Sequence, residues 1–190
     1  MPADPAPRAS SLNDSPPDGP VPHRTGAVLL IGMPGCGKST VGRPLAERLG
    51  VPFVDPDLLI IAGEGATVLG DVSENLDRAG FLELETRYNL DVPAEPSVIA
   101  PGGSVIYCDP AMERFRTFAT IVWLDVPVPA LEARLGCLKE RAVVMAPGAT
   151  LHDVAAERRP FLEKWADLRI DADDRSPESL AAEIQERVAG

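Results

Sequence analysis

The sequence is poor in cysteine, in basic residues and in long hydrophobic runs, and each shortage excludes a class of protein. Its 190 residues include three cysteines, at positions 36, 108 and 137, and no two of them have CxxC spacing. An odd number without that spacing argues against a disulfide scaffold or a cysteine zinc site. It is typical of a reducing compartment, so we expect a cytoplasmic protein.

Positive charge is scarce as well. The chain has 18 Lys and Arg residues against 29 Asp and Glu residues, which gives a formal net charge of −11. Proteins that bind a nucleic-acid backbone neutralise many phosphates with basic side chains, so we expect no nucleic-acid partner. One basic pocket can still hold a small anion. No run reaches the ~18–20 apolar residues of a transmembrane helix, so we expect no membrane partner.

The first 24 residues differ in composition from the rest of the chain. They contain seven prolines and almost no large apolar side chains. Such a segment buries too little apolar surface to offset its ordering entropy, which predicts a disordered tail. It has no apolar core of the kind found in secretory signals, and its acidic residues are atypical of a transit peptide. Residues 25–190 have the length of a single domain.

The remaining sequence alternates between two kinds of pattern. Short apolar runs predict buried strands, and helical patterns lie between them. The predicted strands are residues 27–31, 53–54, 97–100, 121–125 and 168–170; the predicted helices are 38–49, 57–62, 71–76, 78–91, 110–118, 127–136, 150–165 and 177–188. Strands that alternate with helices indicate an α/β fold with a parallel sheet covered on both faces. Pro44 lies inside the first helix, where proline tends to kink the helix.

A phosphate-binding motif follows the first strand directly. Residues 32–39 read GMPGCGKS, which matches GxxxxGK[ST] between an apolar strand and a helix. Glycines let the loop turn its N–H groups toward a polyphosphate, and the helix N-terminus adds its positive dipole end. Lys38 can reach the terminal phosphates, while the Ser39 hydroxyl can ligate Mg²⁺. The expected nucleotide-binding residues here are Gly35, Cys36, Gly37, Lys38, Ser39 and Thr40.

Such a loop identifies a nucleotide but not a reaction. The sequence has no NKxD-type guanine signature, and one small domain leaves little room for a motor. A small-molecule kinase is therefore favoured by elimination. We expect ATP and Mg²⁺ as its cofactors.

The stretch IGMPGCGKSTVGRPLAERLGVPFVDPD, residues 31–57, resembles the opening of shikimate kinases, and the resemblance covers residues from about 27 to 188. It implies a P-loop three-layer sandwich with about five parallel strands and a mobile lid near residues 137–150. We expect a monomer with a small-molecule acceptor. In that family the first aspartate of the Asp-x-Asp pair assists Mg²⁺, and the second binds the acceptor's hydroxyls. These are Asp55 and Asp57 here.

The residues themselves allow two interpretations of this aspartate pair. Carboxylates at the carboxyl end of a strand lie at the crevice where α/β proteins bind ligands. Aspartates on either side of a proline also occur as ordinary turn residues. The phosphate-binding loop favours the first interpretation.

The resemblance places further acceptor-binding residues in two later segments. Residues 101–105, Pro-Gly-Gly-Ser-Val, correspond to the family's GGGSV-type loop, so Gly102 and Gly103 would approach the acceptor. Pro101 replaces the first glycine, which stiffens the loop and removes one N–H donor. Arg158, in the segment Glu157–Phe161, takes the place of the arginine that grips the acceptor carboxylate; bidentate guanidinium geometry suits that task. The alternative interpretation is that Arg158 is an exposed helix residue that pairs with a nearby glutamate.

Two more arginines match the family's nucleotide side. Arg134 corresponds to the arginine at the edge of the adenine, and Arg141 to the lid arginine that folds over the transferring phosphate. A lid cation stabilises the negative charge that phosphoryl transfer spreads over the equatorial oxygens. Taken alone, both would be ordinary surface cations. Residues 142–144, Ala-Val-Val, replace the family's Pro-Leu-Leu, so the packing of the lid differs.

One departure bears on the substrate. The family carries Phe-Arg-x-x-Glu where this chain has Phe81-Leu82-Glu83-Leu84-Glu85. Leu82 cannot donate the hydrogen bond that the family's arginine gives to shikimate, and loss of a charged donor costs about 1.5–3 kcal/mol. Glu85, which orients that arginine in the family, is left without it.

The sequence predicts an ATP-dependent kinase that phosphorylates a hydroxyl group of a small polar acid, with Lys38, Asp57 and Arg141 as the catalytic residues. Shikimate is the acceptor that the resemblance implies. Leu82 and Pro101 leave room for another hydroxy acid or hydroxylated amino acid, and a gluconate or nucleoside monophosphate kinase is a second possibility. A catalytically silent ATP-binding regulatory module is a third, against which the intact Lys38, Ser39, Asp55 and Arg141 argue.

Overall fold

The computed structural model describes residues 26–135 and 148–189. The predicted tail, at residues 1–24, and most of the predicted lid, with Arg141 in it, lie outside the described residues.

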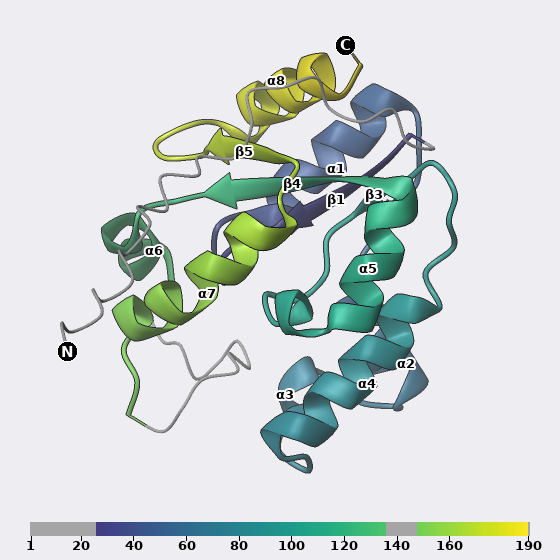
Figure 1. The fold of residues 1–190 in the computed structure, drawn as a ribbon, viewed down its shortest axis with the longest axis vertical. Coiled ribbons are helices and arrows are strands. Elements are labelled where there is room, and N and C mark those ends of the chain that lie inside the picture. The colour runs from purple at the N-terminus through teal and green to yellow at the C-terminus, as the bar shows by residue number, and fades with distance from the viewer. Residues whose placement is uncertain (1–25, 136–147, 190) are drawn as a thin grey trace, which may run out of the picture.

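A parallel sheet forms the middle layer of the domain (Figure 1). Its strands are β1 (Ala27–Ile31), β2 (Phe53–Val54), β3 (Val98–Ile99), β4 (Ala119–Asp125) and β5 (Leu168–Asp171), in the order β2-β3-β1-β4-β5. β1 lies at the centre, with Leu29 opposite Ile99 of β3 and Ile121 of β4. All strand pairs are parallel, which confirms the predicted fold class.

Helices cover both faces of this sheet. Figure 1 shows α1 (Lys38–Leu49) and α8 (Pro177–Ala189) on one face, and α5 (Asp109–Phe118) and α7 (Leu151–Trp165) on the other. Val28 and Leu30 of β1 belong to the buried cluster on the first side, whereas Leu29 and Ile31 belong to the second cluster. Because successive side chains of a strand point to opposite faces, a strand buried on both sides needs an uninterrupted apolar run.

A third group of helices lies beyond the β2 edge of the sheet. It consists of α2 (Pro56–Gly63), α3 (Leu69–Ser73) and α4 (Arg78–Leu90), and it has its own small core of Ile60, Val72 and Leu84. The short helix α6 (Val128–Leu135) follows β4, and a 3₁₀ turn η1 (Val105–Tyr107) leads into α5.

The elements differ from the predicted ones in a few places. α3 begins two residues earlier than predicted, because the Asp71 carboxylate accepts hydrogen bonds from the N–H groups of Thr67 and Val68 at 3.2 Å each and fixes the start of the helix. η1 was not predicted. α1 continues through Pro44 as one helix.

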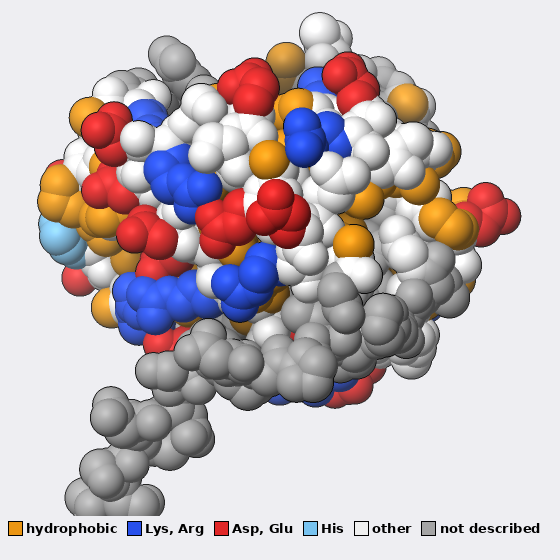
Figure 2. Space-filling view, turned by 90° about the horizontal axis from the view of Figure 1, so that it is seen from above, with side chains coloured by type: hydrophobic (Ala, Val, Ile, Leu, Met, Phe, Trp, Pro, Cys, Tyr) orange, Lys and Arg blue, Asp and Glu red, His pale blue; other side chains and the backbone are white. Residues whose placement is uncertain are grey.

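The face of the domain that α1 and α8 cover carries charges of both signs. In Figure 2, Lys and Arg side chains stand beside Asp and Glu side chains over the face that α1 and α8 cover. Among the described helices, none combines the length and the apolar character needed to cross a bilayer.

Candidate active site

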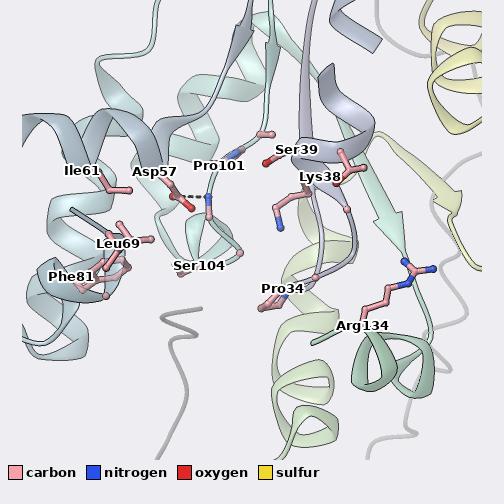
Figure 3. A pocket seen from close by; sticks show the side chains of 18 of the residues that line it. Pro34, Lys38, Ser39, Asp57, Ile61, Leu69, Phe81, Pro101, Ser104 and Arg134 are labelled. Atoms are coloured by element: carbon pink, nitrogen blue, oxygen red, sulfur yellow. Dashed lines mark hydrogen bonds between the residues drawn. The ribbon is translucent and has the colours of Figure 1, made fainter. Parts of the chain in front are cut away.

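A cavity of about 480 Å³ lies between the loop after β1 and the α2–α4 group. Figure 3 shows Lys38 and Ser39 on one side, Asp57 and Phe81 on the other, and Arg134 at a far end. The residues that line it are Pro34, Gly35, Gly37, Lys38, Ser39, Thr40, Asp57, Ile61, Val68, Leu69, Gly70, Phe81, Ala100, Pro101, Gly102, Gly103, Ser104, Arg134 and Arg158. The cavity thus joins most of the predicted nucleotide and acceptor residues.

The loop at residues 32–39 depends on glycine at two points. Gly37 has φ 97° at the start of α1, a left-handed conformation that other residues rarely adopt. A Cβ on Gly32 would lie 2.7 Å from the Leu124 carbonyl oxygen, so the loop can approach β4 only without a side chain there. The Lys38 ammonium donates to the carbonyls of Gly32 and Met33 at 3.2 and 3.4 Å, which folds its side chain over the loop.

Most of the predicted nucleotide residues line the cavity, but Cys36 does not. The Cys36 side chain is buried behind the loop, and its N–H group donates to the Met33 carbonyl at 3.2 Å. Arg134 lies in the last turn of α6 and is exposed at the rim.

Asp55 connects the phosphate loop with α2. It is the N-cap of α2, where one carboxylate oxygen accepts from the Asp57 N–H at 3.1 Å and the other accepts from the Ser39 hydroxyl at 3.4 Å. A hydroxyl and a carboxylate are hard oxygen ligands, and Mg²⁺ typically uses one or two such protein ligands together with phosphates and water. Ser39 and Asp55 therefore fit a Mg²⁺–nucleotide site. Within the described residues, no group of three His, Cys, Asp or Glu side chains forms an all-protein metal cage.

Asp57 lies opposite Lys38 across the cavity (Figure 3). Its carboxylate accepts a hydrogen bond from the Gly102 N–H at 3.1 Å, so the glycine loop holds it in place. Burial raises the pKa of Asp57 to about 6, the Asp55 charge adds to this rise, and Lys38 opposes it. A carboxylate with such a pKa is ionised at neutral pH and suited to accept a proton from a hydroxyl group.

Arg158 reaches the same loop from α7. It is only 1% exposed, and its Nη1 donates to the Gly103 carbonyl at 3.0 Å. A Cβ on Gly103 would lie 2.6 Å from that nitrogen, so this close approach requires glycine. The pKa of Arg158 is lowered by burial, and Tyr107 is the first of the groups that oppose this effect. The alternative of an exposed arginine on a solvated helix face is wrong for Arg158.

Glu85 is a buried carboxyl directly behind the glycine loop. The family's motif marked it as the partner of the arginine that Leu82 replaces, and not as a site residue of this chain. Glu85 is 1% exposed, and a Cβ on Gly102 would lie 2.8 Å from its Oε1 and 2.9 Å from Asp57 Oδ1. The two carboxyl groups therefore occupy the space that a side chain at position 102 would need. Burial raises the pKa of Glu85 to about 7, a hydrogen bond from Ser104 opposes the rise, and Asp57 adds to it.

The acceptor side of the cavity also has an apolar wall. Ile61, Val68, Leu69 and Phe81 supply it from α2, α4 and the start of α3. Sequence reasoning did not find these residues, because nothing in an amphipathic helix pattern says which apolar side chains face a ligand. Leu82 is not among the lining residues; it is half-buried and packs against the core cluster between the sheet, α5 and α7.

Comparison with known proteins agrees with this geometry. The model of the shikimate kinase family matches residues 34–189. Shikimate kinase of Symbiobacterium thermophilum is 37% identical over 166 residues, which is 85% of this chain and 95% of that protein. Human threonine synthase-like 1 is 33% identical over 159 residues, covering 83% of this chain and 21% of that protein.

A solved structure gives the same likeness in three dimensions. Shikimate kinase from Acinetobacter baumannii in complex with shikimate superposes with a TM-score of 0.79 and 29% identity, over 86% of this chain and 93% of that one.

Proposed function

This chain belongs to the shikimate kinase family, and we propose that its acceptor is shikimate or a closely similar polyhydroxy acid, phosphorylated in the cavity between Lys38 and Asp57. As a member of the family it is an ATP-dependent kinase that transfers a phosphoryl group to a hydroxyl group. The observation that carries the proposal for the acceptor is the position of Asp57, half-buried opposite the phosphate loop and held by the Gly102 N–H.

The phosphate end of the cavity binds the nucleotide in this proposal. Backbone N–H groups around Gly35 and Gly37 face the phosphates, and the N-terminus of α1 adds its positive dipole end. Lys38 leaves its two loop carbonyls and contacts the terminal phosphates, where it neutralises the charge that grows between the leaving and transferring groups. Arg134 flanks the adenine at the far end of the cavity.

Ser39 and Asp55 would hold Mg²⁺ beside the phosphates, Ser39 directly and Asp55 from the adjoining N-cap. When bound, the ion neutralises the phosphate charge and aligns the terminal phosphoryl group.

Asp57 is the group that prepares the acceptor. Its carboxylate accepts the hydrogen bond of the acceptor hydroxyl, orients its oxygen toward the terminal phosphate and takes the proton as the new O–P bond forms. The terminal phosphoryl group of ATP passes to that oxygen, its bond to the bridging oxygen breaks, and ADP leaves. Lys38 lies across the cavity from Asp57, so the donor and the base approach the reacting atoms from opposite sides.

Arg158 binds the carboxylate of the acceptor in this proposal. Its guanidinium is fixed at one nitrogen by the Gly103 carbonyl, and the same side chain lines the cavity. Arg141, outside the described residues, remains our candidate for the cation that covers the transferring phosphate. We further propose that the chain acts as a cytoplasmic monomer.

The test is a coupled assay of ADP release with MgATP and a panel of acceptors: shikimate, gluconate and other hydroxy acids, and nucleoside monophosphates. We expect shikimate or a related polyhydroxy acid to stimulate ADP release, and mass spectrometry to find one phosphate added to the acceptor. Asp57→Asn serves as the matched control, because it keeps the phosphate loop intact and removes the base.

Stimulation by a nucleoside monophosphate alone would assign a different acceptor class. ADP release that no acceptor stimulates would contradict the proposal and favour a regulatory nucleotide-binding module.

A further inference from the structure

Two clusters of the same composition lie along α4, one at each end. In the first, Arg78 Nη2 and the Tyr107 hydroxyl both donate to Glu157 Oε1, at 2.7 and 2.9 Å. The Arg78 guanidinium carbon lies 5.0 Å from the centre of the Tyr107 ring. The cluster joins α4, η1 and α7, three elements that are distant in the sequence.

In the second cluster, Arg87 Nη2 and the Tyr88 hydroxyl both donate to Glu64 Oε1, at 2.9 Å each. The Arg87 guanidinium carbon lies 5.3 Å from the centre of the Tyr88 ring. This cluster fastens α4 to the C-terminal end of α2.

The two clusters differ in what their tyrosines contact. The Tyr107 ring also faces Arg158, whose guanidinium carbon lies 5.6 Å from the ring centre, and it packs edge-to-face against Phe161. The Tyr88 ring packs against the small core of the α2–α4 group and the backbone of Gly63. The first cluster therefore contacts Arg158, the lining arginine on the acceptor side, whereas Tyr88 of the second faces the small core.

We propose that Arg78, Glu157 and Tyr107 form a positioning cluster that holds the Arg158 guanidinium at the angle at which it binds the acceptor. The inference rests on the proposed function, in which Arg158 binds the acceptor carboxylate. Gly103 fixes one nitrogen of Arg158, and the Tyr107 ring supports the guanidinium plane from the side. Arg78 and Glu157 hold Tyr107 in turn. The hydrogen bonds of Arg78 and Tyr107 to Glu157, at the surface of the domain, therefore set the orientation of the buried Arg158 guanidinium.

The orientation of the Arg158 guanidinium is important because, within the described residues, this cavity has few cations on its acceptor side. Arg158 is the arginine on the acceptor side among the lining residues that the structure describes, since Arg134 lies at the far end. Leu82 offers no second donor from α4. A planar fork binds a carboxylate only when both N–H groups point at it, so a small tilt of one guanidinium reduces binding. Support for its charge also comes from Tyr107, which opposes the lowering of the Arg158 pKa by burial.

The experiment compares matched substitutions in the two clusters. Tyr107→Phe and Arg78→Gln alter the first cluster; Tyr88→Phe and Arg87→Gln alter the second in the same chemical way. Steady-state kinetics are measured with shikimate as the acceptor and with ATP, together with the Tm of each variant. Arg158→Lys and the double variant Arg158→Lys/Tyr107→Phe complete the set.

We expect the first-cluster variants to raise the acceptor KM by about three- to tenfold, which corresponds to about 0.7–1.4 kcal/mol. The KM for ATP and kcat should stay within about twofold, because the phosphate end is untouched. The second-cluster variants should leave the acceptor KM within about twofold. In the Arg158→Lys background, Tyr107→Phe should have no further effect, because the guanidinium it supports is gone.

The outcomes separate the inference from the proposed function. An unchanged acceptor KM in Arg158→Lys would contradict the role of Arg158 and the inference with it. A raised KM in Arg158→Lys, with Tyr107→Phe and Arg78→Gln both no different from their Tyr88 and Arg87 counterparts, would overturn the inference alone. A rise in acceptor KM that tracks the fall in Tm across all four single variants would also overturn it, because the cluster would then act through stability.

Discussion

The phosphate end and the acceptor end of the cavity are built in different ways. The phosphate loop is one continuous segment, residues 32–40, and in the proposed function much of its nucleotide binding comes from backbone groups and the N-terminus of α1. The acceptor end combines side chains from α2, the start of α3, α4 and α7 with the glycine loop after β3. A backbone cradle depends on glycines at fixed spacing, whereas the acceptor end depends on the packing of five separate segments.

The departures from the family's pattern lie outside the phosphate loop, which matches its motif at every position. Pro101 lines the acceptor end, Leu82 on α4 packs against the core, and residues 142–144 lie outside the described residues. Substitutions at the acceptor end change which groups face the acceptor without disturbing the nucleotide. Damage at the phosphate end should therefore abolish transfer to any acceptor, and changes at the acceptor end should act on affinity, selectivity and pH response.

The largest effect should follow from Lys38→Ala. The lysine neutralises charge that grows during phosphoryl transfer, and effects of cations on such transfers reach about 10³-fold or more. We expect a loss of turnover of that order with every acceptor, measured as ADP release under saturating MgATP. Lys164→Ala is the control, because Lys164, on α7, forms an exposed ion pair with Asp109. Wild-type turnover in Lys38→Ala would contradict the assignment of the phosphate end.

The second prediction separates the two aspartates that lie on either side of Pro56. Asp57→Asn should lower kcat/KM for the acceptor by about 10²–10³-fold, because general bases contribute on that scale. ATP binding should persist, since Asp57 has no place at the phosphate end. Asp55→Asn is the matched substitution, and it should instead weaken the dependence on Mg²⁺ and disturb the N-cap of α2.

Titration of acceptor turnover against Mg²⁺, and of ATP binding by calorimetry, measures both effects. If the two variants lose ATP affinity equally, the division of roles between the aspartates is wrong.

The contrast between a contiguous phosphate loop and an acceptor end built from separate segments also explains how much could be predicted from the sequence. The five strands and the alternation of helices followed from apolar runs and helical periodicity, and the structure confirms them. The phosphate residues could be located because a contiguous motif places them, although periodicity alone could not show that Cys36 faces the core. Such patterns predict local structure, and the phosphate loop can be predicted from them because its residues are contiguous.

The acceptor wall could not be predicted in the same way. Ile61 and Leu69 read as ordinary apolar helix positions, and which side of a helix faces a cavity depends on packing against distant elements. The burial of Arg158 and Glu85 was likewise hidden, because charged residues in helices are mostly exposed. Their partners, Gly103 and Gly102, come from a loop far away in the sequence.

The third prediction concerns the stability cost of the buried Glu85. Its pKa is raised from 4.5 to about 7 in the folded protein, chiefly by burial. A raised pKa means that the folded state binds the proton more tightly, so this contribution to stability is complete below pH 4.5 and is lost as the pH rises to about 7. At about 1.4 kcal/mol per pH unit, the loss amounts to about 3 kcal/mol.

Glu85→Gln removes the titration and should show this cost directly. The Tm of the variant minus that of the wild type should increase by several degrees between pH 5 and pH 8. Glu83→Gln, at an exposed position of the same helix, should give a Tm difference that stays nearly constant with pH. A constant difference for Glu85→Gln as well would mean that Glu85 keeps an ordinary pKa in the folded protein.

The smallest effect should come from Leu82→Arg, which gives the acceptor end a second donor. Residues 82 and 85 lie three apart on α4, so a guanidinium at 82 can pair with Glu85, and this pair would hold it toward the acceptor. Shikimate KM should fall by roughly tenfold, equivalent to about 1.4 kcal/mol. Arg78 lies one turn before, and repulsion between like charges at this spacing costs only about 0.2–0.5 kcal/mol.

Leu82→Lys is the control that tests geometry against charge. An ammonium brings the same charge but cannot bind a carboxylate with two parallel hydrogen bonds, so its gain in shikimate affinity should be smaller. Both variants lose the contact of Leu82 with the core, and their Tm values should fall by a similar amount. A higher shikimate KM in Leu82→Arg, at equal Tm to Leu82→Lys, would show that a cation at this position of α4 disfavours shikimate and that the acceptor end suits a different acid. The acceptor end would then have diverged in substrate while the phosphate end stayed the same.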